Sequence, residues 1–124
     1  MDTTASTLIP VNRQLSLVAW FELYMAIEAG PRDSNTFKAK KRDLQDFINY
    51  VRTAAGTDHP DQSTRSLTED FLKYLRKERK LAPTNINRVL ATLRHPASWI
   101  HKQRPFLAGH PCERVQEIAV EDPE

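Results

Sequence analysis

The chain has 124 residues, enough for one domain with a modest core, and its 40% hydrophobic and 27% charged residues are ordinary for a globular protein. Its single cysteine, Cys112, excludes an internal disulfide, and no apolar run approaches the roughly 20 residues that a membrane-spanning helix needs. The N-terminal stretch lacks the basic start and apolar centre of a secretory signal, so we expect a cytoplasmic protein.

The net charge of +2 conceals a polarised distribution. Residues 34–104 hold 15 Lys and Arg against 7 Asp and Glu, whereas the rest of the chain holds 3 against 9. A basic body followed by an acidic end favours a nucleic-acid partner for the body. The alternative is that the lysines are scattered over the surface and serve only solubility.

The first expected helix follows residues 1–15, which have no periodicity and are predicted to be a disordered lead-in. Ser16 can cap this helix, and Gly30-Pro31 ends it. Its broad apolar face contains Leu17, Trp20, Phe21, Leu23, Tyr24 and Ile27. Either all of these side chains lie in the chain's own core, or Trp20 and Tyr24 are partly exposed to a partner chain.

A second helix is predicted over residues 37–56, with capping residues in Ser34-Asn35 and a C-cap glycine at Gly56. Its first turns carry Lys38, Lys40, Lys41 and Arg42. The helix dipole disfavours cations there by a few tenths of a kcal/mol each, roughly. This conflict favours a role other than helix stability for these residues, with a simply solvated face as the alternative.

Residues 57–65 contain no apolar side chain and predict a flexible polar loop, in which His59 has no second ligand at metal-binding spacing. A third helix follows, with Thr68 as its expected cap and Glu69 and Asp70 in its first turn. The cations at its end, residues 76–80, suit the helix dipole and need no further function.

A fourth helix is predicted over residues 80–104, with Thr84 as a possible cap and an apolar stripe of Ile86, Val89, Leu90, Leu93, Ala97 and Ile100. Asn87, Arg88, Arg94, His95 and Lys102 lie between the stripe residues. Pro96 predicts a kink near His95, or two helices that meet there. Residues 112–124 read as a short turn and an acidic, disordered tail.

Catalytic and metal-binding motifs are missing from this pattern. The sequence has no glycine-rich phosphate loop, no paired Cys or His motif, and no nucleophile with a base at a recognisable spacing. We therefore expect no cofactor, no metal and no small-molecule substrate. An outward-facing helix with Arg and Asn suits the major groove of double-stranded DNA, where Arg reads guanine and Asn reads adenine. Lys and Arg nearby would contact phosphates, as we expect for Lys102.

The order of the segments RDLQDFINYV, SLTEDFLKYL and INRVLATLRHPASWI, followed by GHP, resembles the N-terminal core-binding domain of tyrosine recombinases, or phage-type integrases. The similarity runs over roughly residues 16–115. It implies an all-α, orthogonally packed four-helix bundle of the SAM-like type over residues 16–111, with residues 112–124 leading towards a separate catalytic domain. Lys40 and Pro96 depart from the family pattern, which places an aromatic and a bulky apolar residue there.

Such a domain clamps recombination-site DNA with its second and fourth helices, while the catalytic domain breaks and rejoins the strands. By position, the resemblance nominates as DNA-binding residues Lys38, Lys41, Arg42, Asn87, Arg88, Arg94 and His95. It implies that this chain carries no catalytic residue, and that the first helix helps neighbouring protomers associate. The alternative function is a small helical protein–protein interaction module that uses the aromatic first helix as its surface.

Overall fold

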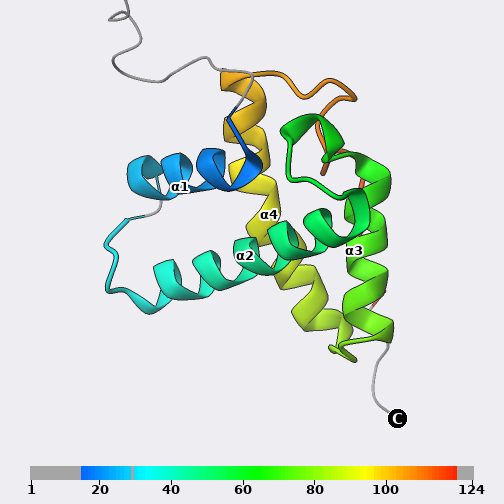
Figure 1. Cartoon of the computed structure of the whole chain (residues 1–124). Helices are drawn as coiled ribbons and strands as arrows, with labels where there is room; N and C mark the ends of the chain where they lie inside the picture. The colour runs from blue at the N-terminus through cyan, green and yellow to red at the C-terminus, as the bar shows by residue number, and fades with distance from the viewer. Residues whose placement is uncertain (1–14, 29, 120–124) are drawn as a thin grey trace, which may run out of the picture.

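The computed structural model describes residues 15–28 and 30–119, and the regular secondary structure within these ranges is helical. The elements in chain order are α1 (Leu17–Glu28), α2 (Asn35–Ala55), the 3-10 turn η2 (Pro60–Gln62), α3 (Arg65–Lys77) and α4 (Pro83–Gln103). In Figure 1, α1 and α2 lie one above the other and cross α4, while α3 stands to one side. The predicted all-α class with four long helices is confirmed, and α4 contacts each of the other three.

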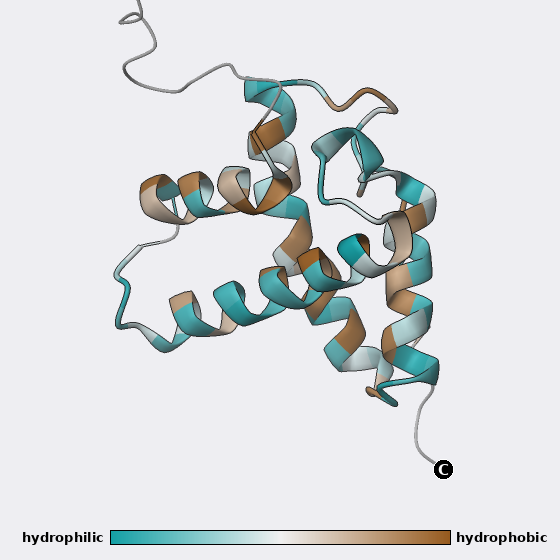
Figure 2. Cartoon of the chain, in the orientation of Figure 1, coloured by the Kyte–Doolittle hydropathy of each residue, from teal (hydrophilic) through white to brown (hydrophobic). Residues whose placement is uncertain are grey.

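A single apolar core lies between the helices, and Figure 2 shows largely hydrophilic residues on the outer sides of α2 and α3. Its largest fully buried side chains come from every helix and from the C-terminal segment, and include Trp20, Ile48, Phe71, Leu90 and Val115. Burial of one such side chain contributes about 1.5–3 kcal/mol. The helical stripes predicted from the sequence therefore supply the core.

α1 begins where two separate groups accept its free amides. The Ala19 N–H donates to Ser16 Oγ at 3.2 Å, which confirms the predicted cap, and the Leu17 N–H donates to the Asp58 carbonyl at 2.7 Å. Trp20 and Tyr24 are only 0% and 4% exposed. Of the two alternatives, these two rings follow burial in the chain's own core and not exposure to a partner chain, although Ile27 on the same helix is 49% exposed.

α2 has the predicted caps at both ends. Ser34 Oγ accepts the Phe37 N–H at 3.0 Å, and Gly56 adopts a φ of 78°, in the left-handed region that glycine tolerates best. Lys40 is half-buried near the start of the helix. Its Nζ donates to Tyr24 Oη at 3.1 Å and lies 5.4 Å from the ring centroid, so the tyrosine accommodates a cation next to the core.

The connection from α2 to α3 is folded and differs from the open polar loop that the sequence predicts. Besides capping α1, Asp58 accepts a hydrogen bond from Arg52 Nη2 at 3.3 Å. Asp61 in η2 forms an ion pair of 3.0 Å with Arg104, whose side chain is 2% exposed. The connection thus fastens the ends of α1, α2 and α4.

α3 begins earlier than predicted. Thr64 is its N-cap, because Thr64 Oγ1 accepts the Leu67 N–H at 3.2 Å. Thr68, the predicted cap, is fully buried within the helix, and its Oγ1 donates to the Thr64 carbonyl at 3.2 Å. The prediction was wrong because two threonines stand four residues apart and both can cap a helix.

α4 is one helix from Pro83 to Gln103. Pro83 is at its first turn and the N-cap residue Ala82 offers no side-chain hydrogen bond, so the predicted cap at Thr84 is wrong. The helix continues through the buried Pro96, whose missing N–H removes one hydrogen bond to the preceding turn. Of the two predicted outcomes, two separate helices are not found, and the helix changes direction about halfway along its length in Figure 1, in line with a kink.

Residues 110–118, which we name the C-terminal strap, pack against α4. Cys112 and Val115 are buried in the core, and Ile118 is half-buried. Residues 112–118 are therefore part of the packed structure and not of the predicted disordered tail. The rest of that tail, residues 120–124, and the predicted lead-in up to residue 14 lie outside the described residues.

Candidate nucleic-acid interface

The outer face of α2 carries exposed cations and no exposed acid. The exposed charged side chains of this helix are Lys38, Lys41, Arg42 and Arg52, of which Arg52 is ion-paired with Asp58 at 3.3 Å. Its two acidic residues, Asp43 and Asp46, are buried and half-buried. Because the apolar stripe is buried on the opposite side, this face presents positive charge to solvent over most of the helix.

α4 presents a second line of positive or titratable groups. The helix contains no acidic residue, and its exposed basic side chains are Arg88, His95 and Lys102. They recur every seven residues, which is close to two turns of an α-helix, so they lie in one line along the helix. The exposed Ala91 lies on the same side of the helix, and its small side chain would let a partner approach the α4 backbone closely.

The two helices meet at the buried carboxylate of Asp43. Arg88 Nη1 lies 2.7 Å from Asp43 Oδ2, and Arg42 Nε lies 4.0 Å from Asp43 Oδ1. The Asp43 side chain is 5% exposed, whereas those of Arg88 and Arg42 are 48% and 67% exposed. One buried negative charge thus holds two arginines from different helices next to each other, and both remain open to solvent.

A groove between α1, α2 and α4 gathers Arg94, His95 and Lys102 with Lys40, which the sequence analysis did not nominate. Tyr24 and Trp99 line the same groove. The helical period of α2 turns Lys40 away from Lys38 and Lys41, towards α4. That period was the signal that could have assigned Lys40 to this groove.

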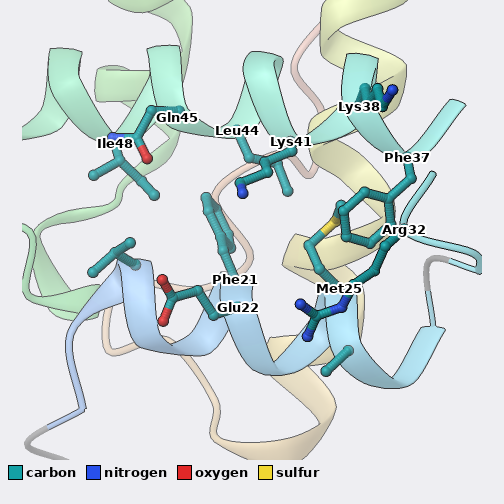
Figure 3. A pocket seen from close by; sticks show the side chains of 12 residues that line it. Phe21, Glu22, Met25, Arg32, Phe37, Lys38, Lys41, Leu44, Gln45 and Ile48 are labelled. Atoms are coloured by element: carbon teal, nitrogen blue, oxygen red, sulfur yellow. The ribbon is translucent and has the colours of Figure 1, made fainter. Parts of the chain in front are cut away.

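Lys38 and Lys41 lie at a different groove, between α1 and α2 (Figure 3). Its apolar lining includes Phe21, Phe37 and Ile48. Figure 3 shows Lys41 over the groove and Lys38 directed away from its centre, with Arg32 and Glu22 on the α1 side. The nominated residues other than Asn87 therefore divide between three places: the α1–α2 groove, the Asp43 junction, and the groove between α1, α2 and α4.

Two nominated side chains are engaged within the fold. Asn87 Nδ2 donates to the Ile118 carbonyl at 2.9 Å, and Asn87 Oδ1 accepts the Ile118 N–H at 2.8 Å. Arg94 Nη2 donates to the Val115 carbonyl at 2.6 Å. In this conformation Asn87 cannot make the paired hydrogen bonds that recognise adenine, because the strap already uses both ends of its amide.

The histidines near the end of α4 have structural partners. His101 Nδ1 accepts the Phe106 N–H at 3.0 Å, and His110 Nδ1 accepts the Cys112 N–H at 3.0 Å. His110 Nε2 lies 2.8 Å from Ser98 Oγ. Burial, followed by the neighbouring His101, lowers the pKa of His110, so its ring is neutral and joins the strap to α4.

Catalysis by a thiolate, metal binding and a membrane-spanning helix find little support in the described part of the chain. Burial raises the pKa of the Cys112 thiol to about 12, which disfavours a nucleophilic thiolate. No three His, Cys, Asp or Glu side chains gather as metal ligands within the described residues. No described helix combines the length and apolar character needed to cross a bilayer.

Comparison with known proteins finds tyrosine recombinases. The chain is 35% identical over 78 residues to tyrosine recombinase XerD of Listeria innocua serovar 6a, and equally to the XerD of Listeria monocytogenes serotype 4b. The match covers 63% of this chain and 26% of each relative, so the chain spans about a quarter of the length of the curated relatives that it matches. No protein-family model and no solved structure matches.

Proposed function

We propose that this similarity reflects a shared role, and that the chain is a DNA-binding domain of a tyrosine recombinase of the SAM-like, core-binding type. The observation that carries the proposal is the distribution of exposed charge. Every exposed charged or titratable side chain of α2 and α4 is a Lys, Arg or His, and the two helices join at Asp43. Double-stranded DNA is the polyanion that two such helices fit.

The cations have two kinds of contact available on a duplex. Lys38, Lys41 and Arg42 on α2 suit phosphate oxygens, which fix position without reading sequence. Arg88 on α4 has a planar guanidinium, which can pair with two acceptors of guanine in the major groove. Asp43 holds this guanidinium in place at 2.7 Å and reduces the entropy that the side chain would lose on binding.

The breaking and rejoining of DNA strands belongs, in this proposal, to other parts of a larger recombinase. This chain supplies the grip on one face of the recombination site and no catalytic residue. Further recombinase protomers on the same DNA are also proposed partners, but Trp20 and Tyr24 cannot contact them while buried. The alternative of an interaction module based on α1 loses its main support for the same reason.

Fluorescence anisotropy with a 30-base-pair duplex at several salt concentrations tests this function. We expect binding that weakens steeply with salt, because each phosphate contact releases a counterion. A variant with Lys41→Ala and Lys102→Ala removes one exposed cation from each helix and is expected to bind about tenfold more weakly. Neither side chain takes part in the core, so the fold should be retained.

The matched control is Arg76→Ala with Lys77→Ala, which removes two exposed cations from the last turn of α3. It should bind almost as tightly as the original chain. The proposal fails if the original chain does not bind duplex at low salt, if binding is insensitive to salt, or if both double variants lose the same affinity.

A further inference from the structure

The C-terminal strap contacts side chains that lie beside the cationic line of α4, and we propose that the strap and duplex DNA compete for Asn87 and Arg94. This inference rests on the proposed function and concerns the regulation of the same surface. In the closed conformation described here, the strap holds both side chains. In the open conformation, the strap leaves α4 and both side chains become available to DNA.

Asn87 and Arg94 are seven residues apart, as are Arg88 and His95 next to them. The two pairs therefore form parallel lines on adjacent sides of α4, rotated by about 100°. Only the line with Arg88 and His95 is exposed in the closed conformation. Opening the strap would widen the DNA-facing side of α4 from one line to two.

The strap uses both hydrogen-bonding ends of Asn87, at 2.9 and 2.8 Å, and one nitrogen of Arg94, at 2.6 Å. These bonds go to backbone groups of Ile118 and Val115, so they do not depend on the identity of the strap side chains. DNA cannot take up Asn87 in the paired arrangement that recognises adenine until both of its bonds break. Arg94 has five N–H donors, so its single bond to Val115 fixes the guanidinium towards the strap without occupying all of its donors.

The charge of the strap acts in the same direction. Glu113 and Glu117 are exposed on it and line a hollow together with Arg94 and the strap's own Arg114, so the strap has an excess of one carboxylate. Carboxylates at this place would repel the phosphates of an approaching duplex. A closed strap thus both occupies Arg94 and opposes the polyanion that Arg94 would contact.

The strap is held at separate points and contains one strained residue. It has no regular secondary structure; its anchors are the buried Pro111, Cys112 and Val115, the half-buried Ile118, and hydrogen bonds to Asn87, Arg94 and Ser98 of α4. Arg114 has a φ of 66°, in the left-handed region that residues with a Cβ disfavour. A segment without regular secondary structure and with local strain can detach without unfolding the helices.

Two pairs of variants move the strap in opposite directions. Val115→Ser weakens the main anchor, whereas Gln116→Ser changes its exposed neighbour and serves as the control. Arg114→Gly relieves the strained φ, whereas Arg114→Ala removes the same charge and keeps the strain. We expect Val115→Ser to bind duplex about threefold more tightly than Gln116→Ser. Arg114→Gly should bind more weakly than Arg114→Ala, because its closed strap is more stable.

Hydrogen exchange of the Ile118 amide in the unaltered chain gives a readout that needs no variant. This amide donates to Asn87 in the closed strap, so saturating duplex is expected to accelerate its exchange. The competition is refuted if duplex binds but leaves both pairs of variants equal and the Ile118 amide fully protected. If duplex binds neither the unaltered chain nor Val115→Ser, the proposed function itself fails. These two failures are therefore distinguishable.

Discussion

Arg104, at the end of α4, has a side chain that is only 2% exposed, and its Nη1 lies 3.0 Å from Asp61 Oδ1 in η2. This ion pair joins the residue that directly follows α4 to the connection between α2 and α3. A buried guanidinium needs such a partner, because an unpaired buried charge is strongly destabilising. A connection that looks like an ordinary surface loop in sequence therefore stabilises the end of α4.

Replacement of Asp61 by Asn should lower the free energy of unfolding by about 2–4 kcal/mol, because it leaves Arg104 buried without a countercharge. Asp46→Asn is the control, since Asp46 lies 3.8 Å from Arg79, whose side chain is 44% exposed. It should cost less than about 1 kcal/mol. Urea unfolding followed by circular dichroism measures both, and equal losses would contradict the role given to Arg104.

The ion pair between Asp61 and Arg104 also predicts that the stability of the fold depends on pH in acid. The Arg104 guanidinium beside Asp61 holds the pKa of that carboxyl below its usual value of 3.8. The folded state thus binds the proton less readily than the unfolded state. The contribution of Asp61 is complete above about pH 4 and is lost as pH falls through the lowered pKa. Asp61→Asn should therefore show a shallower loss of stability below pH 4 than the original chain.

Arg88→Ala is expected to reduce stability by about 1–3 kcal/mol, because it leaves the Asp43 carboxylate buried without its 2.7 Å partner. Arg42→Ala should reduce stability by less than about 0.5 kcal/mol, since Arg42 is more exposed and its Nε lies 4.0 Å away. Thermal unfolding of the two variants compares these contributions. Equal unfolding temperatures would show that Asp43 does not depend on Arg88.

The lowered pKa of His110 predicts a second pH dependence of stability, in a less acidic range than that of Asp61. Its pKa is lowered from the usual 6.5, mainly by burial and then by His101. Because the unfolded chain takes up this proton first, stability is greatest above about pH 6.5 and falls towards the lowered pKa. His110→Gln should remove most of the difference in unfolding temperature between pH 7.5 and pH 5.5. His95→Gln, which changes an exposed ring, should leave that difference intact.

Trp20→Ala should cost about 3–5 kcal/mol, because the Trp20 side chain is fully buried and its ring packs edge-on to Trp99 at 6.4 Å. Ile27→Ala, on the same helix but 49% exposed, should change stability by about 0.5 kcal/mol or less. Circular dichroism in urea distinguishes these outcomes. A folded Trp20→Ala variant of unchanged stability would mean that the ring lies outside the core.

The four helices could be predicted because α2, α3 and α4 have a strong apolar period, α1 is a run of mostly apolar residues, and most of them have a local end signal. Ser34 and Gly56 are good examples, since each acts through a residue a few positions away. The predicted start of α3 was wrong, because Thr64 and Thr68 are equally good N-cap residues by sequence. Only the burial of Thr68 in the tertiary structure decides between them. Of the two outcomes predicted at Pro96, two separate helices are not found, since packing of the surrounding helix outweighs one lost hydrogen bond.

The candidate site was harder to predict than the helices. Exposure of Lys38, Lys41 and Lys102 follows from helical period, and the structure agrees. The engagement of Asn87 and Arg94 could not be foreseen, because their partners are backbone groups 31 and 21 residues away in the strap. Every residue has a backbone carbonyl, so the amino-acid sequence does not show which carbonyl a distant side chain will contact.

The line of Arg88, His95 and Lys102 also sets the footprint of α4 on a duplex. Fourteen residues of helix span about 21 Å, at a rise of about 1.5 Å each. The major groove is only about 12 Å wide. If α4 lies across the groove, Arg88 and Lys102 cannot both be inside it, so one end would read base edges while the other rests on the bordering strand.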